Sequence, residues 1–314
     1  MIEHSVAKCL SFHAAYRCGR SGACCSAGWN IPFDAGELQA VSALPLAAGA
    51  IQHTPAGAAA GLRDGHCIFL EADERGTRAC EIHRLGGHAA LPLTCRMFPR
   101  VVLHDTRGTF ISLSHFCPTA AGLLFDDGRP VSIVDAPAAL AGSDPLDGLN
   151  ACDVWPPLLR PGLMMDLESY GSWERKAVDL LVREGLTPRR SLTALEAVTA
   201  RLGAWSPASG PSLPDAVNAA FAADAAEPAA VERGRAGHEA AVKRWLAARL
   251  FGTWIAYQGN GLQTIVRYLR ACLDVFDVEL ARDGNAREAI RRADQLIVHD
   301  SSSQQLANML NERS

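Results

Sequence analysis

The feature that most constrains this chain is the distribution of its cysteines. The 314 residues contain 10 cysteines, and seven of them fall within one stretch of about 100 residues: Cys18, Cys24, Cys25, Cys67, Cys80, Cys95 and Cys117. Thiolates bind soft or borderline metals, and four of them can close a zinc site or hold an iron–sulfur cluster. Ten cysteines are too few for a disulfide scaffold in a chain of this length. The pattern therefore predicts a thiolate metal site in the first part of the chain.

The spacing does not choose between zinc and an iron–sulfur cluster. Cys18 and Cys24 are separated by five residues, Cys25 follows at once, and the remaining cysteines come at wider intervals. A zinc ribbon needs two Cys-x-x-Cys pairs, and ferredoxins and radical S-adenosylmethionine enzymes carry compact cysteine runs that are missing here. We expect Cys24, Cys25, Cys80 and Cys95 to supply most of the ligands, because they occupy the densest blocks.

We expect the other cysteines and the nearby histidines to have ordinary structural roles. Three cysteines lie outside the blocks and are expected to be core residues: Cys9, Cys152 and Cys272. Three histidines neighbour the metal-binding cysteines in sequence: His66, His83 and His115. A neutral imidazole could complete the site, but hydrogen bonding around it is the more common role.

Four sequence blocks carry the seven cysteines: RCGRSGACCSAGWNIPFD, HCIFLEADERGTRACEIH, LPLTCRMFPR and SLSHFCPTAAGLL. Together they resemble the cysteine-cluster family described as a zinc- or iron-chelating domain, and within it the flagellin lysine N-methylase branch. The resemblance covers residues 12–125 well and the helical remainder more weakly. It implies a [4Fe-4S] cluster, S-adenosylmethionine as methyl donor, and a lysine of a partner protein, such as flagellin, as acceptor.

One position departs from that family. The family opens with Cys-x-x-Cys-x-x-Cys-Cys, which places a cysteine where this chain has Ser21. Seven thiols still exceed the four that a closed site requires. We therefore expect the missing eighth thiol not to be a ligand.

Three residues beside the cysteines are candidates for binding the cofactor. Arg96 and Arg100 lie on either side of Phe98-Pro99 in the Cys95 block, and they could neutralise a thiolate cluster or bind the carboxylate of S-adenosylmethionine. Salt bridges that fix the loop are an equal alternative. Trp29 could cover the metal group or line a pocket, although a place in the core is the usual one for such a residue. No catalytic residue is assigned from the sequence.

Two functions from different classes remain open. The first is S-adenosylmethionine-dependent methylation of a lysine, for which the chain lacks the glycine-rich turn of a Rossmann donor site. The second is a non-catalytic zinc- or iron–sulfur-binding module that acts in protein interaction or metal delivery. Only the first predicts binding of the methyl donor.

The sequence predicts a mainly α fold, in which a loop-rich cysteine-cluster domain with a short β-hairpin packs on an α-helical C-terminal domain. The expected parts are a metal-binding domain at 1–130, a Pro-rich connection at 131–163 and a helical domain at 164–314. Apolar residues at three- and four-residue spacing predict four long helices, at 173–185, 191–205, 239–258 and 262–282.

Shorter elements are also predicted. Asp34 is a suitable N-cap for a helix over 34–44, and residues 100–114 show the pattern of two strands around a polar turn. The stretch 205–236, rich in Ala, Pro, Ser and Gly, is expected to be a loop or a loosely packed helical insertion. We expect the part from 165 onward not to fold without the first domain, because its longest helices carry broad apolar stripes.

Charge and hydropathy exclude some partners. The net charge is −4 and Lys and Arg are scattered, which is unlike a general nucleic-acid binder. The sequence has no uncharged apolar run of about 18 residues and no signal-peptide layout at its start. We therefore expect a soluble, cytoplasmic protein without a nucleic-acid or membrane partner; the oligomeric state is left open.

Overall fold

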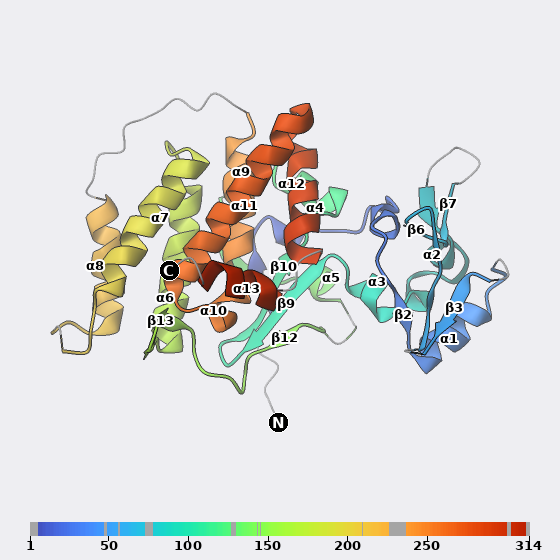
Figure 1. Cartoon of the computed structure of the whole chain (residues 1–314), viewed down its shortest axis with the longest axis horizontal. Coiled ribbons are helices and arrows are strands. Elements are labelled where there is room, and N and C mark those ends of the chain that lie inside the picture. Colours follow the sequence, from blue (N-terminus) through green and yellow to red (C-terminus); the bar gives the residue numbers. More distant parts are fainter. Residues whose placement is uncertain are drawn as a thin grey trace.

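The computed structural model describes residues 6–46, 49–55, 57–72, 78–126, 130–142, 144, 146–208, 210–225, 237–299 and 303–311. About 51% of the described residues are helical and 16% are strand, so the fold is mixed α/β. Figure 1 shows the long helices at one end, a sheet in the middle and a small lobe at the other end. The expectation of a mainly α fold with one hairpin is therefore corrected.

A central sheet of five strands accounts for most of that correction, with the order β11-β1-β10-β9-β12. Its strands are β1 Lys8–Leu10, β9 Arg100–Asp105, β10 Gly108–Leu113, β11 Ile133–Asp135 and β12 Leu149–Asn150. The predicted hairpin over 100–114 is confirmed as β9 and β10. It recruits three distant short segments, because β1 and β12 add in parallel to its two strands and β11 pairs with β1. Such long-range pairings leave little local signal in a sequence.

The sheet separates two apolar cores. Side chains alternate along a strand, so Leu103 and Phe110 join the large core of the helices, whereas Val102 and Ile111 face a smaller core on the other side. In the large core, Leu103 and Phe110 pack with helical residues such as Trp173. The hairpin is therefore buried on both faces and ties the cysteine-bearing part to the helices.

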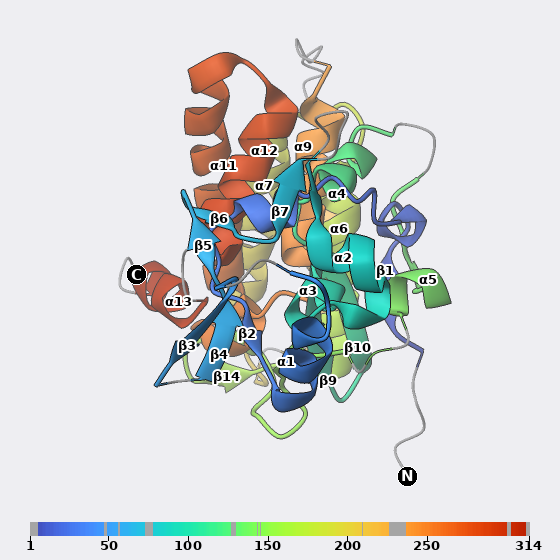
Figure 2. The same cartoon turned by 90° about the vertical axis from the view of Figure 1, so that its right-hand side faces the viewer.

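The small lobe is built from short elements. Its strands are β2 Pro32–Phe33, β3 Ile51–Thr54, β4 Gly57–Ala60, β5 Leu62–Arg63, β6 His66–Cys67, β7 Leu70–Ala72 and β8 Arg78–Cys80. Its helices are α1 Ala35–Ser42, α2 Glu81–Gly86 and α3 Leu93–Met97. The predicted N-cap is confirmed, since the Asp34 side chain and Glu37 form a capping box on α1. Figure 2, which faces this lobe, shows it in front of the sheet and the helices.

The remaining elements form the helical part and its connection to the sheet. Helices α4 Pro118–Leu123 and α5 Ala138–Ala141 and the pair β13 Leu158–Arg160 and β14 Leu163–Met164 precede the long helices. The later helices are α6 Leu167–Val182, α7 Pro188–Gly203, α8 Leu213–Ala225, α9 Glu239–Leu250, α10 Ile255–Gln258, α11 Leu262–Asp283, α12 Ala286–Asp294, a π-helical turn Gln295–His299 and α13 Ser303–Asn311. None of the described helices is both long and apolar enough to cross a membrane.

The predicted long helices are largely confirmed, with one break. The helix predicted over 239–258 ends at Leu250, and α10 follows after a turn. Gly252 in that turn has φ +59°, and a Cβ on it would lie 3.0 Å from the Phe110 side chain. Its N–H donates 3.0 Å to the buried Glu174 carboxylate. The stretch 205–236 contains α8, a helical insertion, and its residues 226–236 lie outside the described part.

Candidate metal centre

Five of the predicted metal-binding cysteines converge in the small lobe, and we call them the five-thiol cluster: Cys24, Cys25, Cys67, Cys80 and Cys95. They come from a short 3-10 helix at Ala23–Ser26, from β6, from the end of β8 and from α3. The Cys25 thiol interacts as a hydrogen-bond partner with the thiols of Cys24, Cys67 and Cys80. Cys95 is close enough to feel the charges of the same three thiols. The cluster thus unites four segments that are far apart in the sequence.

Two glycines let the double-cysteine turn lie against its neighbours. Gly22 has φ +68°, and a Cβ there would lie 2.9 Å from the carbonyl oxygen of Arg78 in β8. Gly28 has φ +73°, and its Cβ would lie 2.8 Å from the carbonyl oxygen of Gly65. Only glycine combines these conformations with such close approach. His66 adds a link, because its Nδ1 lies 3.2 Å from the carbonyl oxygen of Ser26.

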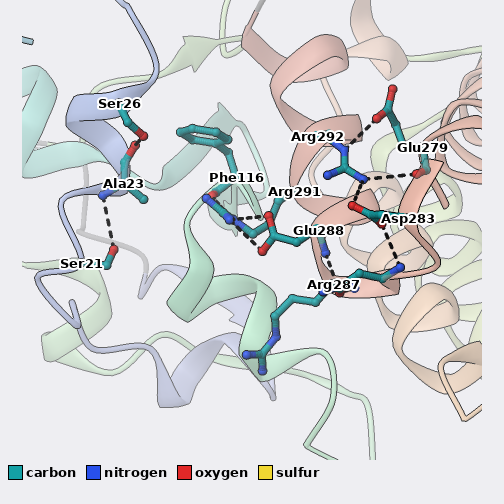
Figure 3. A network of polar contacts seen from close by, with 11 residues as sticks. Ser21, Ala23, Ser26, Phe116, Glu279, Asp283, Arg287, Glu288, Arg291 and Arg292 are labelled. Carbon is teal, nitrogen blue, oxygen red and sulfur yellow. Dashed lines mark hydrogen bonds and ion pairs between the residues drawn. The ribbon is translucent and has the colours of Figure 1, made fainter. Parts of the chain in front are cut away.

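Ser21 stands where the resembled family has a cysteine, and it has a local structural contact. Its hydroxyl accepts a hydrogen bond of 3.4 Å from the N–H of Ala23, and the Ser26 hydroxyl donates 2.8 Å to the carbonyl of Ala23 (Figure 3). Both contacts stabilise the turn that presents Cys24 and Cys25. A hydroxyl can therefore shape this loop in place of a thiol.

The thiols of the cluster alter one another's acidity. Hydrogen bonds to Cys24, Cys67 and Cys80 raise the pKa of Cys25 far above its usual range. The hydrogen bond from Cys25 lowers the pKa of Cys24 and of Cys67, and lowers that of Cys80 to about 7. Burial raises the pKa of Cys95, and the negative charges of its neighbours raise it further. The thiol pKa is therefore lowered at three positions around Cys25, whose own pKa is raised.

The donor atoms are gathered but not arranged as a ready site. Across the described ranges, no three His, Cys, Asp or Glu side chains have the geometry of a preformed metal site. The thiols of the five-thiol cluster are instead held together by hydrogen bonds and by the packing of Cys67, Cys80 and Cys95 against a third apolar core, which lies within the small lobe. What the fold supplies is a donor set of soft ligands in one place.

Cys18 and Cys117 form a separate group, which we call the outer thiol pair. The Tyr16 hydroxyl lies 3.8 Å from the sulfur of Cys117 and is also a hydrogen-bond partner of Cys18. Cys117 is the N-cap residue of α4 and is buried in the smaller core, which also contains Val102 and Ile111. Cys18 is exposed. Of the seven predicted ligands, the fold brings five together and places these two elsewhere.

Two cavities adjoin the five-thiol cluster. The main cavity has a volume of about 620 Å³, and its lining includes Cys24, Cys25, Cys80, Cys95 and both cysteines of the outer thiol pair. The second cavity, of about 420 Å³, is lined by Cys24, Cys25, Cys67 and Cys95, with Trp29 and His299 beside them. Cys24, Cys25 and Cys95 line both cavities, so the cluster lies between them. The main cavity is within the size range of small-molecule sites.

Both predicted arginines line the main cavity, but much of each guanidinium is engaged inside the protein. Arg96 pairs with Asp144 at 3.2 Å and donates to the carbonyl of Leu91. Arg100 donates to the carbonyls of Leu140 and Arg96. These bonds fix the loops that follow Cys95. The expected salt bridge is thus observed for Arg96, whereas Arg100 is held by hydrogen bonds to carbonyls. The role of both arginines in binding a ligand stays a prediction.

Trp29 lies in the wall of the second cavity and is only partly buried against the core of the small lobe. Its ring centroid lies 4.4 Å from that of His299 and 5.3 Å from that of Phe98. His299, from the π-helical turn, also bonds the hydroxyl of Ser114 at 2.7 Å through Nε2. The C-terminal part of the chain therefore reaches the wall of the site, which the sequence did not indicate.

The remaining predicted residues are placed as follows. His83 lines the main cavity, and burial followed by the charge of Arg20 lowers its pKa. His115 is fully buried away from the five-thiol cluster, beside Asp294. Cys9 and Cys272 are core residues as predicted, but Cys152 is exposed and that expectation is wrong. Its segment follows β12, an edge strand of the central sheet, and residues 152–155 are all exposed.

Sequence reasoning missed the cationic wall of the main cavity. Tyr16, Arg17 and Arg20 line it together with the predicted Arg96 and Arg100. Arg20 adopts the left-handed conformation, with φ +53°, in the loop between Cys18 and Cys24. The signal that could have found the wall was its position, because Tyr16 and Arg17 directly precede Cys18.

Comparison with known proteins adds no assignment to this site. The sequence matches no model of a protein family, and no curated protein or solved structure is similar enough to be matched.

Proposed function

We propose that the five-thiol cluster binds a metal group, an iron–sulfur cluster or a zinc ion, and that the chain is a protein lysine N-methylase that uses S-adenosylmethionine. One observation carries the proposal: five thiols from four separate segments meet beside a cavity of about 620 Å³. Free cysteines are usually buried singly as small apolar residues. A convergence of five is the donor chemistry of a soft-metal site.

The residues present fit such a group. Four thiolates satisfy a structural zinc ion or a [4Fe-4S] cluster, and three suffice for a cluster with an open iron. The cluster offers three thiols whose pKa is lowered, and the metal would displace the proton of Cys25. The assignment favours Cys24, Cys25, Cys67, Cys80 and Cys95 over the outer thiol pair as ligands.

The main cavity is where we place the methyl donor. The central sheet has mixed strand directions, unlike the doubly wound sheet whose glycine-rich turn holds the donor in Rossmann enzymes. The cavity wall carries Arg17, Arg20 and Arg100, and Asp144, the one carboxylate among the described lining residues, is paired with Arg96. The positive wall would attract the carboxylate of the donor. A bound metal group would add Lewis acidity toward the donor's amino and carboxylate groups.

The same positive wall affects an acceptor lysine. A lysine ammonium has no lone pair, and its unperturbed pKa is about 10.4, so the proton must leave before the nitrogen can attack a methyl group. Burial in the cavity and nearby like charges both disfavour the charged form. The arginines of the wall would therefore lower the pKa of an entering lysine and favour its free amine.

Anaerobic purification with iron, zinc and sulfide analysis, followed by calorimetric titration with S-adenosylmethionine, tests both parts. We expect stoichiometric metal, donor binding by the metal-loaded protein, and methylation of lysines in a flagellin or other acceptor detected by mass spectrometry. Cys80→Ala should lose metal and donor binding, and Cys152→Ala, at an exposed cysteine outside the site, should keep both.

The outcomes separate the two parts of the proposal. Metal without donor binding, at donor concentrations well above about 1 mM, would remove the methylase and leave a metal-binding module. Absence of metal from the anaerobic protein, with Cys80→Ala indistinguishable from the parent, would remove the metal centre itself.

A further inference from the structure

The outer thiol pair makes its main interactions outside the five-thiol cluster. The largest thiol interactions of Cys25 and Cys95 are with Cys24, Cys67 and Cys80. Those two sulfurs interact instead with each other's charge and share one hydroxyl, that of Tyr16, which lies 3.8 Å from Cys117. The main cavity thus has a second group of thiols in its wall.

The two segments that carry the pair contact each other through residues next to the cysteines. A Cβ on Gly19, the residue after Cys18, would lie 2.7 Å from the hydroxyl oxygen of Thr119, two residues after Cys117. A disulfide requires its two Cα atoms to lie within about 7 Å. Contact between the flanking residues, together with the Tyr16 hydroxyl with which both sulfurs interact, places Cys18 and Cys117 on neighbouring segments of the cavity wall.

The two thiols differ in access, which suits stepwise exchange. Cys18 is exposed, so a small disulfide can reach it, whereas Cys117 is only 6% exposed. The guanidinium of Arg100 is near enough to interact with the charge of Cys18. The thiolate is the attacking species in disulfide exchange, and attack requires access to the disulfide, which Cys18 has.

We propose that Cys18 and Cys117 are a redox-active dithiol in the wall of the main cavity, which a small disulfide such as oxidised glutathione converts to an intramolecular disulfide. The Cys18 thiolate attacks one sulfur of oxidised glutathione, forms a mixed disulfide and releases one glutathione. The Cys117 thiolate then attacks the Cys18 sulfur and releases the second. The protein loses two electrons and two protons, and both glutathiones leave as thiols.

The modification would change the cavity directly. The disulfide would tie the loop that bears Arg17 and Arg20 to the first turn of α4, both of which line the main cavity. The site does not depend on the methylase proposal, because it needs neither the donor nor the acceptor.

The test uses the full-length, metal-loaded protein with oxidised glutathione as the probe. Free thiols are alkylated after incubation, and peptide mass spectrometry follows each cysteine separately. We expect Cys18 and Cys117 to lose alkylation together and to appear in one linked peptide that dithiothreitol releases. Exposed Cys152 should form only a mixed disulfide with glutathione.

Two variants make the test decisive. Cys117→Ala removes the resolving thiol, so the mixed disulfide at Cys18 should accumulate. In Cys18→Ala the buried Cys117 should remain unmodified. Cys18→Ala should keep its metal, in contrast to Cys80→Ala. Loss of metal from Cys18→Ala, or a stable mixed disulfide at Cys18 in the parent protein, would overturn the proposal.

Discussion

The Nε2 atoms of His13 and His115 lie 3.1 Å apart, and both side chains are fully buried. His13 follows β1, and His115 lies between β10 and α4. Asp294, at the end of α12, accepts a hydrogen bond from the N–H of His115 and lies 3.3 Å from its Nδ1. Three distant segments therefore meet at one buried polar contact.

This contact predicts acid sensitivity. Burial lowers the pKa of His13 and of His115, so the folded protein keeps both neutral where the unfolded chain, with a pKa of about 6.5, takes up protons. Stability is therefore complete above about pH 6.5 and falls below it, by up to about 1.4 kcal/mol per pH unit for each histidine. Denaturant unfolding between about pH 7.5 and pH 5.5 measures this slope.

Variants assign that slope to the pair. His13→Gln and His115→Gln should each flatten it, and His53→Gln, at an exposed histidine, should leave it unchanged. Equal slopes in all of these proteins would show that other groups control the acid response. Asp294 adds sensitivity only at lower pH: burial opposes its charge, but Arg249 and His115 outweigh burial and hold its pKa below the usual range.

Replacing Cys80 by Ala should remove most of the bound metal and lower the free energy of unfolding by about 2 kcal/mol or more, because site formation is coupled to folding. The matched change Cys272→Ala affects a fully buried cysteine of the helical core. It should keep the metal and cost about 1 kcal/mol of packing. Metal analysis and denaturant unfolding of both variants check this; equal metal content in the two would contradict the assignment of Cys80.

Arg107 should be essential for stability. It binds Asp105 at 2.7 Å and Glu174 at 3.0 Å, and both carboxylates are buried. Arg107→Met leaves them without their counter-ion, which should cost about 3–5 kcal/mol. The exposed pair of Arg189 and Asp277 offers a control, since Arg189→Met should cost less than about 1 kcal/mol. Denaturant unfolding of both variants measures the two losses. Similar losses would contradict the prediction that burial makes the ion pairs of Arg107 more important for stability than the exposed pair of Arg189.

A fragment of residues 165–314 should not fold alone. In the full chain, Leu10, Leu103 and Phe110 share one apolar core with residues of α6, α9 and α11. Removing the sheet exposes that face to water, at about 25 cal/mol per Å² of apolar surface. Size-exclusion chromatography and thermal unfolding of the fragment test this, and a monomer with a cooperative transition would contradict it.

The sequence by itself determined the features that depend on neighbouring residues. The period of apolar residues set α6, α7 and α11, the Asp34 cap set the start of α1, and alternation set the β9–β10 hairpin. These are local because helix turns, caps and tight hairpins are made by residues close together in the chain. The sequence also identified the donors of the candidate site as cysteine thiols, because the type of donor depends only on residue identity.

Tertiary structure decided the arrangement of those donors. Cys24, Cys67 and Cys80 meet because Gly22 and Gly28 allow close packing of distant strands. Cys18 and Cys117 instead interact with the hydroxyl of Tyr16. It also decided that β1, β11 and β12 join the hairpin in one sheet. Such contacts span tens of residues, and whether they form depends on the packing of the whole chain. The sequence therefore identified seven candidate thiols. It did not show that five of them form the five-thiol cluster and that the other two form the outer thiol pair.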